Sequence, residues 1–176
     1  MRTADNAETT QNTKTTPSSV VFRFARRGDC ALILSFIREL AKYERMENDV
    51  VATEEMIAQW LFDKHAAEVL FAVVDDREVG FALFFSSFST FLGRAGMYLE
   101  DIYILPEYRG RGFGSAMFKK LANIATQRGY GRFEWACLDW NTPSIAFYRS
   151  LGAEPVDGWT TYRLSGSTLS DLANKE

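Results

Sequence analysis

A glycine-rich segment, Arg109–Ser115, carries the clearest chemical pattern in this chain. It reads Arg-Gly-Arg-Gly-Phe-Gly-Ser and stands between an apolar run, Leu99–Leu105, and an amphipathic run that predicts a helix. Its three alternate glycines leave backbone N–H groups unobstructed, and the N-terminus of the following helix carries a partial positive charge. The segment therefore predicts a binding site for a phosphate or pyrophosphate.

Three other interpretations of this segment have to be compared with an anion site. The simplest alternative is a tight strand-to-helix turn without a ligand. A dinucleotide fingerprint needs Gly or Ala where Ser115 stands and an acidic residue at the end of the next strand, whereas Glu134 falls in the middle of that strand. No Gly-x-x-x-x-Gly-Lys-Ser/Thr sequence is present, which excludes a P-loop.

Two further features could move protons. Tyr148 lies in the block Asn141–Ala153, and its phenol stays protonated at neutral pH because the ordinary pKa of tyrosine is about 10. The alternative role for Tyr148 is packing beside Phe147. Glu100 and Asp101 interrupt an otherwise apolar strand. They point to opposite faces if that strand is regular, and a β-bulge would change this.

Together these blocks resemble the two signatures of the GNAT N-acetyltransferase superfamily, Arg-x-x-Gly-x-Gly and Asn…Ala…Phe-Tyr…Gly. Three short segments are similar to the diamine and thialysine acetyltransferase branch. They are Leu-Ala-Lys-Tyr-Glu at 40–44, Tyr-Leu-Glu-Asp at 98–101 and Asp-Trp-Asn at 139–141. The resemblance covers roughly residues 20–165. It implies a homodimeric enzyme that transfers an acetyl group from acetyl-CoA directly to a small primary amine.

The resemblance also implies which residues hold acetyl-CoA. The backbone of Ile102, Tyr103 and Ile104 would pair with the pantetheine arm like a further strand. Asn141 and Ser144 would hydrogen-bond the arm from the other side, and Tyr148 would reach the sulfur as general acid. The pyrophosphate would be wrapped by the loop residues Arg109, Gly110, Arg111, Gly112, Phe113, Gly114 and Ser115.

Acidic side chains would receive the amine. Glu100 is the candidate base, because burial would raise its pKa, and whether it acts as base or as amine anchor is open. Glu44 either contacts the amine or belongs to a solvated run of charged residues, and both interpretations are open. By resemblance, the other residues that contact the amine would be Tyr43, Glu44, Asp101, Glu134 and Asp157.

One departure concerns the loop Phe88–Arg94. Polyamine-specific relatives carry an acidic residue and a Trp there, whereas this loop has no acid. A long polycation would lose a distal anchor, which favours thialysine or a lysine-like amino acid as acceptor. The net charge of −3 gives no strong field for nucleic acid or for an anionic membrane.

Hydrophobic periodicity predicts the element order β-α-α-β-β-β-α-β-α-β. Asp29 and Thr53 are expected to cap the first two helices, and the last helix is expected to begin at Thr142-Pro143 and end at Gly152. The fold class is α/β with a mixed antiparallel and parallel sheet flanked by helices on both faces, as in the GNAT fold. The expected strands are residues 20–25, 69–74, 79–88, 96–105, 132–138 and 159–164.

Length and composition predict one domain over residues 20–165, a flexible polar tail at 1–19 and a polar tail at 166–176. Cys30 and Cys137 match no disulfide or zinc spacing, and the single histidine, His65, has no partners for a metal site. We therefore expect a cytoplasmic protein without a metal and without a membrane span.

Two other functions fit the same motifs. One is a non-catalytic acyl-CoA-binding module that senses the cofactor, although a sensor has no need of both Glu100 and Tyr148. The other is a protein or peptide N-acetyltransferase, which needs an open groove for a chain. Within the enzyme class, acetylation of Cys137 is the alternative to direct transfer.

Overall fold

The computed structural model describes residues 19–175, so most of the predicted N-terminal tail lies outside the described residues. The chain forms two compact units, one ending at Ala136 and the other beginning at Cys137. The single domain over residues 20–165 stays a prediction.

The first unit is built on a five-stranded sheet in the order β1-β2-β3-β4-β5. Neighbouring strands from β1 to β4 are antiparallel, and β4 and β5 are parallel. The predicted mixed sheet is therefore confirmed. The strands are β1 (Val21–Phe24), β2 (Glu68–Val74), β3 (Arg77–Ser89), β4 (Arg94–Ile104) and β5 (Phe133–Trp135).

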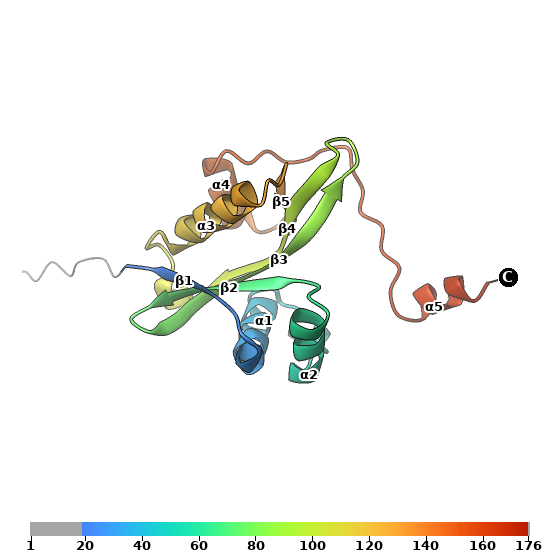
Figure 1. Cartoon of the computed structure of the whole chain (residues 1–176), viewed down its shortest axis with the longest axis horizontal. Helices are drawn as coiled ribbons and strands as arrows, with labels where there is room; N and C mark the ends of the chain where they lie inside the picture. Colours follow the sequence, from blue (N-terminus) through green and yellow to red (C-terminus); the bar gives the residue numbers. More distant parts are fainter. Residues whose placement is uncertain (1–18, 176) are drawn as a thin grey trace, which may run out of the picture. The chain divides into compact units, whose positions relative to one another are not determined.

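Helices cover both faces of this sheet, as the sequence predicts. α1 (Cys30–Glu44) and α2 (Glu54–Ile57) lie on one face, and α3 (Phe113–Gln127) lies on the other (Figure 1). α2 continues into a π-helical turn at Ala58–Asp63. Short 3-10 turns at Arg27–Asp29, Glu47–Asp49 and Pro106–Tyr108 complete the connections.

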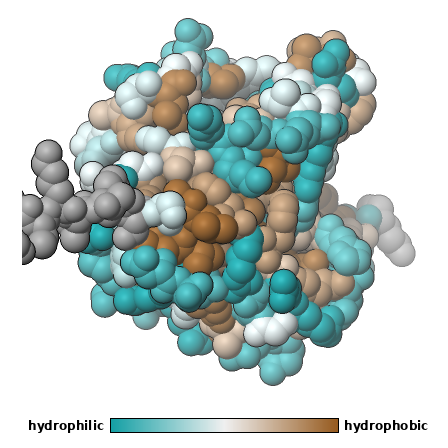
Figure 2. Space-filling model, turned by 60° about the vertical axis from the view of Figure 1, so that its left-hand side comes forward, coloured by the Kyte–Doolittle hydropathy of each residue, from teal (hydrophilic) through white to brown (hydrophobic). Residues whose placement is uncertain are grey.

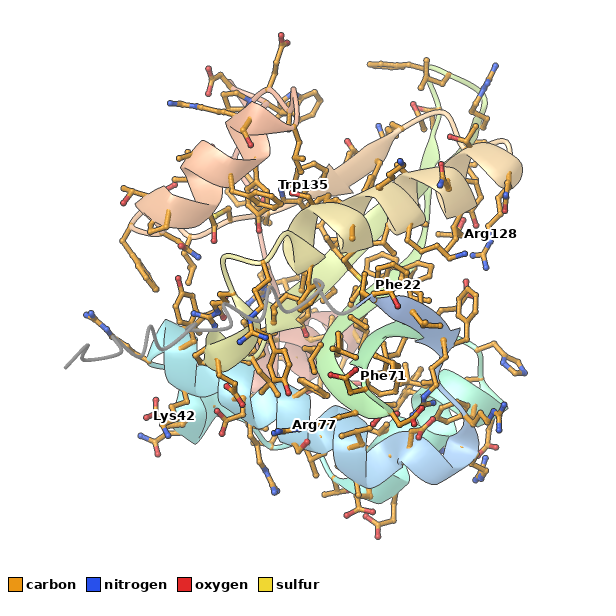
Figure 3. The ribbon with its side chains drawn as sticks, turned by 90° about the vertical axis from the view of Figure 1, so that its left-hand side faces the viewer. Phe22, Lys42, Phe71, Arg77, Arg128 and Trp135 are labelled. Atoms are coloured by element: carbon orange, nitrogen blue, oxygen red, sulfur yellow. The ribbon has the colours of Figure 1, made fainter. Side chains whose placement is uncertain are left out.

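Aromatic side chains fill the space between the sheet and its helices. On the α1 face, the ring centroid of Phe36 lies 5.3 Å from that of Phe81 and 5.9 Å from that of Phe71. Phe118 of α3 lies 5.0 Å from Trp135 of β5. Figure 3 shows Phe71 between the sheet and α1, and Trp135 beside α3. These contacts hold the strands that carry the candidate site between two helical layers.

Apolar residues also reach the surface. Figure 2 shows an apolar area in the middle of one face, bordered by hydrophilic side chains. The most exposed large apolar side chain of the first unit, Phe91 at 94%, lies in the turn between β3 and β4. Among residues 19–175, no helix is long and apolar enough to cross a membrane.

The two predicted N-caps differ in outcome. Thr53 accepts a hydrogen bond from the backbone N–H of Met56 at 3.3 Å, which confirms the cap of α2. Asp29 stands at the N-cap position of α1, but its side chain caps no helical N–H. Its carboxylate instead accepts from the backbone N–H of Arg26 and forms a bidentate ion pair with Arg23, a charge-assisted contact that occupies both oxygens.

The second unit contains α4 (Thr142–Ser150) and α5 (Ser167–Ala173). α4 begins at Thr142 with Pro143 in its first turn, as expected, and the side chain of Asn141 caps it. The strand predicted at residues 159–164 is wrong, because these residues form no strand and Tyr162 is 91% exposed. Strand propensity needs a paired edge to form a ladder, and residues 137–175 contain no strand. The strand predicted at 132–138 is limited to the three residues of β5.

Close approach of β3 and β4 depends on Gly80, which stands opposite Ile104. A Cβ atom at position 80 would lie 2.7 Å from the carbonyl oxygen of Tyr103. We expect Gly80→Ala to lower the free energy of unfolding by about 1–3 kcal/mol, because backbone atoms cannot move aside cheaply.

Urea denaturation measures this change, and Gly28→Ala is the matched control. A Cβ atom at position 28 would meet nothing within 4 Å, so this control should leave stability unchanged or slightly raised. Equal midpoints for Gly80→Ala and the wild type would contradict the steric argument.

Candidate active site

The glycine loop lies at the N-terminus of α3, where the sequence predicts an anion site. Gly112 is the N-cap residue in the left-handed conformation (φ +83°), and Gly110 also has a positive φ of +71°. No side chain caps this helix, and its first backbone hydrogen bond runs from Ala116 N–H to the Gly112 carbonyl. The preceding N–H groups of Phe113, Gly114 and Ser115 therefore face outward together with the positive end of the helix dipole.

Next to this loop, the last residues of β4, 100–104, are paired on one side only. β5 pairs with Met97–Leu99, whereas β3 pairs along β4 as far as Ile104. Among the described strands, none but β3 pairs with residues 100–104. The outer backbone groups of Ile102–Ile104 are thus able to pair with another extended chain. The resemblance assigns the pantetheine arm to this stretch.

A β-bulge in β4 places the two candidate carboxyl groups. Leu83 stands opposite Asp101 and Phe84 stands opposite Leu99, so Glu100 is the extra residue. Adjacent residues of β3 face opposite sides of the sheet, and their partners do the same. Asp101 therefore shares the α1 face with Tyr103, whereas Leu99 faces the other side. The bulge considered from the sequence is present.

Asp101 is the more strongly perturbed carboxyl group. Burial, together with the smaller effects of the negative charges of Glu100 and Glu44, raises its pKa from the ordinary value to about 6. Glu44 ends α1, is partly buried, and has a pKa that is itself raised by burial. Glu44 is thus part of this acidic group rather than of a solvated run of charges. The three carboxyl groups form a negatively charged site that suits an ammonium group.

Glu100 differs from the expectation. Its side chain is exposed, so the predicted burial of this residue is wrong. The bulge is the reason, because the extra residue belongs to neither buried face. Burial raises the pKa of Tyr98 most, and the negative charges of Glu100 and Glu134 raise it as well. Both carboxyl groups therefore lie near Tyr98. Glu134 forms an ion pair with Arg132 at 2.6 Å. The sequence predicts that Asp101 contacts the amine. It does not predict that Asp101 is partly buried, because the alternation of apolar residues in β4 does not reveal the bulge.

Arg109 occupies a position that the sequence does not predict. Its Nε donates a hydrogen bond to the carbonyl oxygen of Ile104 at 2.8 Å. Its guanidinium carbon lies 4.8 Å from the ring centroid of Tyr43 and 5.0 Å from that of Tyr103. The two rings lie 6.5 Å apart, edge to face. Arg109 thus contacts α1 and β4 at the start of the glycine loop.

The remaining predicted site residues lie in the second unit. The amide oxygen of Asn141 accepts from the Ser144 backbone N–H at 3.4 Å. The ring of Tyr148 lies 5.6 Å from that of Phe147. Asp157 is exposed. The roles of these residues toward the cofactor and the amine stay predictions.

Comparison with known proteins defines the family. Residues 34–153 match the acetyltransferase (GNAT) family. The thialysine N-epsilon-acetyltransferase of Sus scrofa is 39% identical over 170 residues, which cover 90% of this chain and 99% of the relative. The L-ornithine N5-acetyltransferase of Arabidopsis thaliana is 28% identical over 85% of this chain and 86% of the relative.

A solved structure, the integron cassette protein VCH_CASS6 from the mobile metagenome of V. cholerae, is similar with a TM-score of 0.75. It is 28% identical and the match covers 89% of this chain and 99% of that one. The chain belongs to the acetyltransferase (GNAT) family and is an amine N-acetyltransferase.

The raised pKa of Asp101 makes stability depend on pH. A carboxyl group with a folded-state pKa above its unfolded value stabilises the fold at low pH, and this stabilisation is lost as pH rises through the folded pKa. Between about pH 4 and pH 7, we expect the wild type to lose up to about 3 kcal/mol of unfolding free energy relative to Asp101→Asn.

Urea unfolding across this pH range measures the difference, and carbon-13 NMR of the Asp101 carboxyl group reads its pKa directly. Parallel pH profiles for the wild type and Asp101→Asn, or an NMR midpoint near the ordinary value for aspartate, would contradict the assignment.

Proposed function

We propose that this N-acetyltransferase uses acetyl-CoA and acetylates a short amino-acid amine, such as thialysine or a lysine-like amino acid. The observation that carries the proposal is the acidic group of Glu44, Glu100 and Asp101 beside the unpaired edge of β4. This group suits a cationic acceptor, and the edge suits an extended acyl carrier.

The residues around the glycine loop fit acetyl-CoA. The outward N–H groups at the start of α3 match a pyrophosphate, and Ile102–Ile104 offer backbone hydrogen bonds to an amide-containing arm. Asn141 and Ser144 are assigned to the same arm by resemblance. When bound, acetyl-CoA supplies an acetyl group activated as a thioester.

The protein's own part in the reaction is to move two protons. A carboxylate removes a proton from the ammonium group, so that the nitrogen lone pair forms the new C–N bond as the C–S bond breaks. Glu100 is the candidate that the sequence offers for this role, with the choice between base and amine anchor left open. Asp101 is the second candidate. Its pKa is raised to about 6, and a general base is most effective when its pKa lies near the pH of the reaction. Tyr148 donates its phenolic proton to the departing sulfur, and its oxygen recovers a proton from the nitrogen, which loses this second proton as it becomes an amide.

The β3–β4 turn supports a short acceptor. Phe91 and Leu92 of this turn and Phe88 at the end of β3 are exposed, and residues 88–94 contain no acidic side chain. A second cationic group far from the reacting nitrogen would therefore meet no carboxylate from this turn. A homodimer is proposed from the resemblance alone. A cytoplasmic location is supported by Cys30 and Cys137, which form no disulfide within residues 19–175.

The acceptor is tested by following thiol release from acetyl-CoA with thialysine, lysine, ornithine, putrescine, spermidine and spermine. We expect the highest kcat/KM for the amino-acid amines, because the β3–β4 turn offers no distal anchor for a polyamine. Preference for spermidine or spermine would contradict the specificity. Binding of CoA without turnover of any amine, including protein and peptide acceptors, would favour the sensor function.

The role of Tyr148 is tested by Tyr148→Phe. Loss of the proton donor should lower kcat by about a hundredfold or more while KM changes little. Tyr162→Phe is the matched control, because Tyr162 is 91% exposed and has no assigned role. Unchanged kcat in Tyr148→Phe would contradict the general-acid role, and a trapped acetyl group on Cys137, with activity lost in Cys137→Ala, would replace direct transfer.

A further inference from the structure

Arg109 joins two parts of the site that the sequence treats separately. Its backbone opens the glycine loop, where a positive charge suits the phosphates of acetyl-CoA. Its side chain turns back, donates from Nε to the Ile104 carbonyl, and lies against the rings of Tyr43 and Tyr103. Among residues 19–175, no carboxylate forms an ion pair with Arg109, so the two tyrosine rings and one carbonyl are its principal neighbours.

The two rings are not equivalent. Tyr103 is 5% exposed and belongs to the core cluster on the α1 face, so its ring is held by packing. Tyr43 is only partly buried and stands in the last turn of α1. Arg109 therefore connects a fixed ring to a less confined one. A planar guanidinium can stack on both rings and still donate from Nε, which an ammonium group cannot do.

Tyr43 is adjacent to the acidic group. The next residue, Glu44, acts electrostatically on Asp101. The position of the last turn of α1 thus determines both where the Tyr43 ring lies and how far the Glu44 carboxyl group is from Asp101. Arg109 contacts that turn from the cofactor side.

We propose that Arg109 is a positioning residue for the amine site: its guanidinium fixes Tyr43 and the end of α1, and amine binding depends on this contact. The inference rests on the proposed function. It differs from a pure phosphate role, in which Arg109 contributes only charge to the glycine loop and the amine site does not respond to the shape of the side chain.

Arg109→Lys separates the two roles, because it keeps the charge and removes the planar group. Positioning predicts that KM for the amine rises about fivefold or more, whereas KM for acetyl-CoA changes less than about twofold. Calorimetric titration of the amine into the protein–CoA complex should show the same loss of affinity. Arg77→Lys is the matched control: Arg77 also lies over a tyrosine ring, that of Tyr108 at 5.8 Å, and should leave both constants unchanged.

A double-mutant cycle completes the test. Tyr43→Leu should raise the amine KM, Tyr43→Phe should retain most of the affinity, and Arg109→Lys should add little to Tyr43→Leu. Additive effects, or a rise in the acetyl-CoA KM alone, overturn the positioning role while the proposed function stands. A wild-type protein that binds CoA but turns over no amine overturns the proposed function, and the positioning role with it.

Discussion

The candidate site depends on one irregularity, the bulge at Glu100 in β4. Before the bulge, Leu99 faces away from α1, and after it, Asp101 and Tyr103 face α1. In a regular strand, Asp101 would face the same side as Leu99, away from α1 and Glu44. The extra residue also leaves Glu100 exposed at the same level of the strand. One inserted position therefore creates two carboxyl groups with different surroundings, which is what separate roles in proton transfer and amine binding require.

The second constraint is the short pairing of β4 with β5. The two strands share a ladder only at Met97–Leu99, because β5 ends at Trp135, opposite Leu99. The parallel pair is held by aromatic contacts of Phe118 with Phe133 and Trp135. Beyond that pair, the edge of β4 and the N-terminus of α3 border the same space. An extended carrier with a phosphate at one end matches these two features.

Electrostatics opposes stability at this site. Burial and neighbouring carboxylates raise the pKa of Asp101, so its ionised form destabilises the fold at neutral pH. Elsewhere, ion pairs offset charge, as in the bidentate contacts of Arg23 with Asp29 and of Arg128 with Glu68. Within residues 19–175, no ion pair engages Glu44, Glu100 or Asp101, as expected where a cationic substrate is to supply the missing charge.

The sequence by itself determined the element order of the first unit, the place of the glycine loop before a helix and the family, because glycine spacing and hydrophobic periodicity are local properties of the chain. It also identified Glu100 and Asp101 as a pair. Only the tertiary structure decided that Asp101 is partly buried and Glu100 exposed, since a bulge is defined by pairing with β3. The stacking of Arg109 on Tyr43 and Tyr103 likewise joins residues far apart in the chain. The strand expected at residues 159–164 failed for the same reason: a strand requires a partner, and no local pattern supplies one.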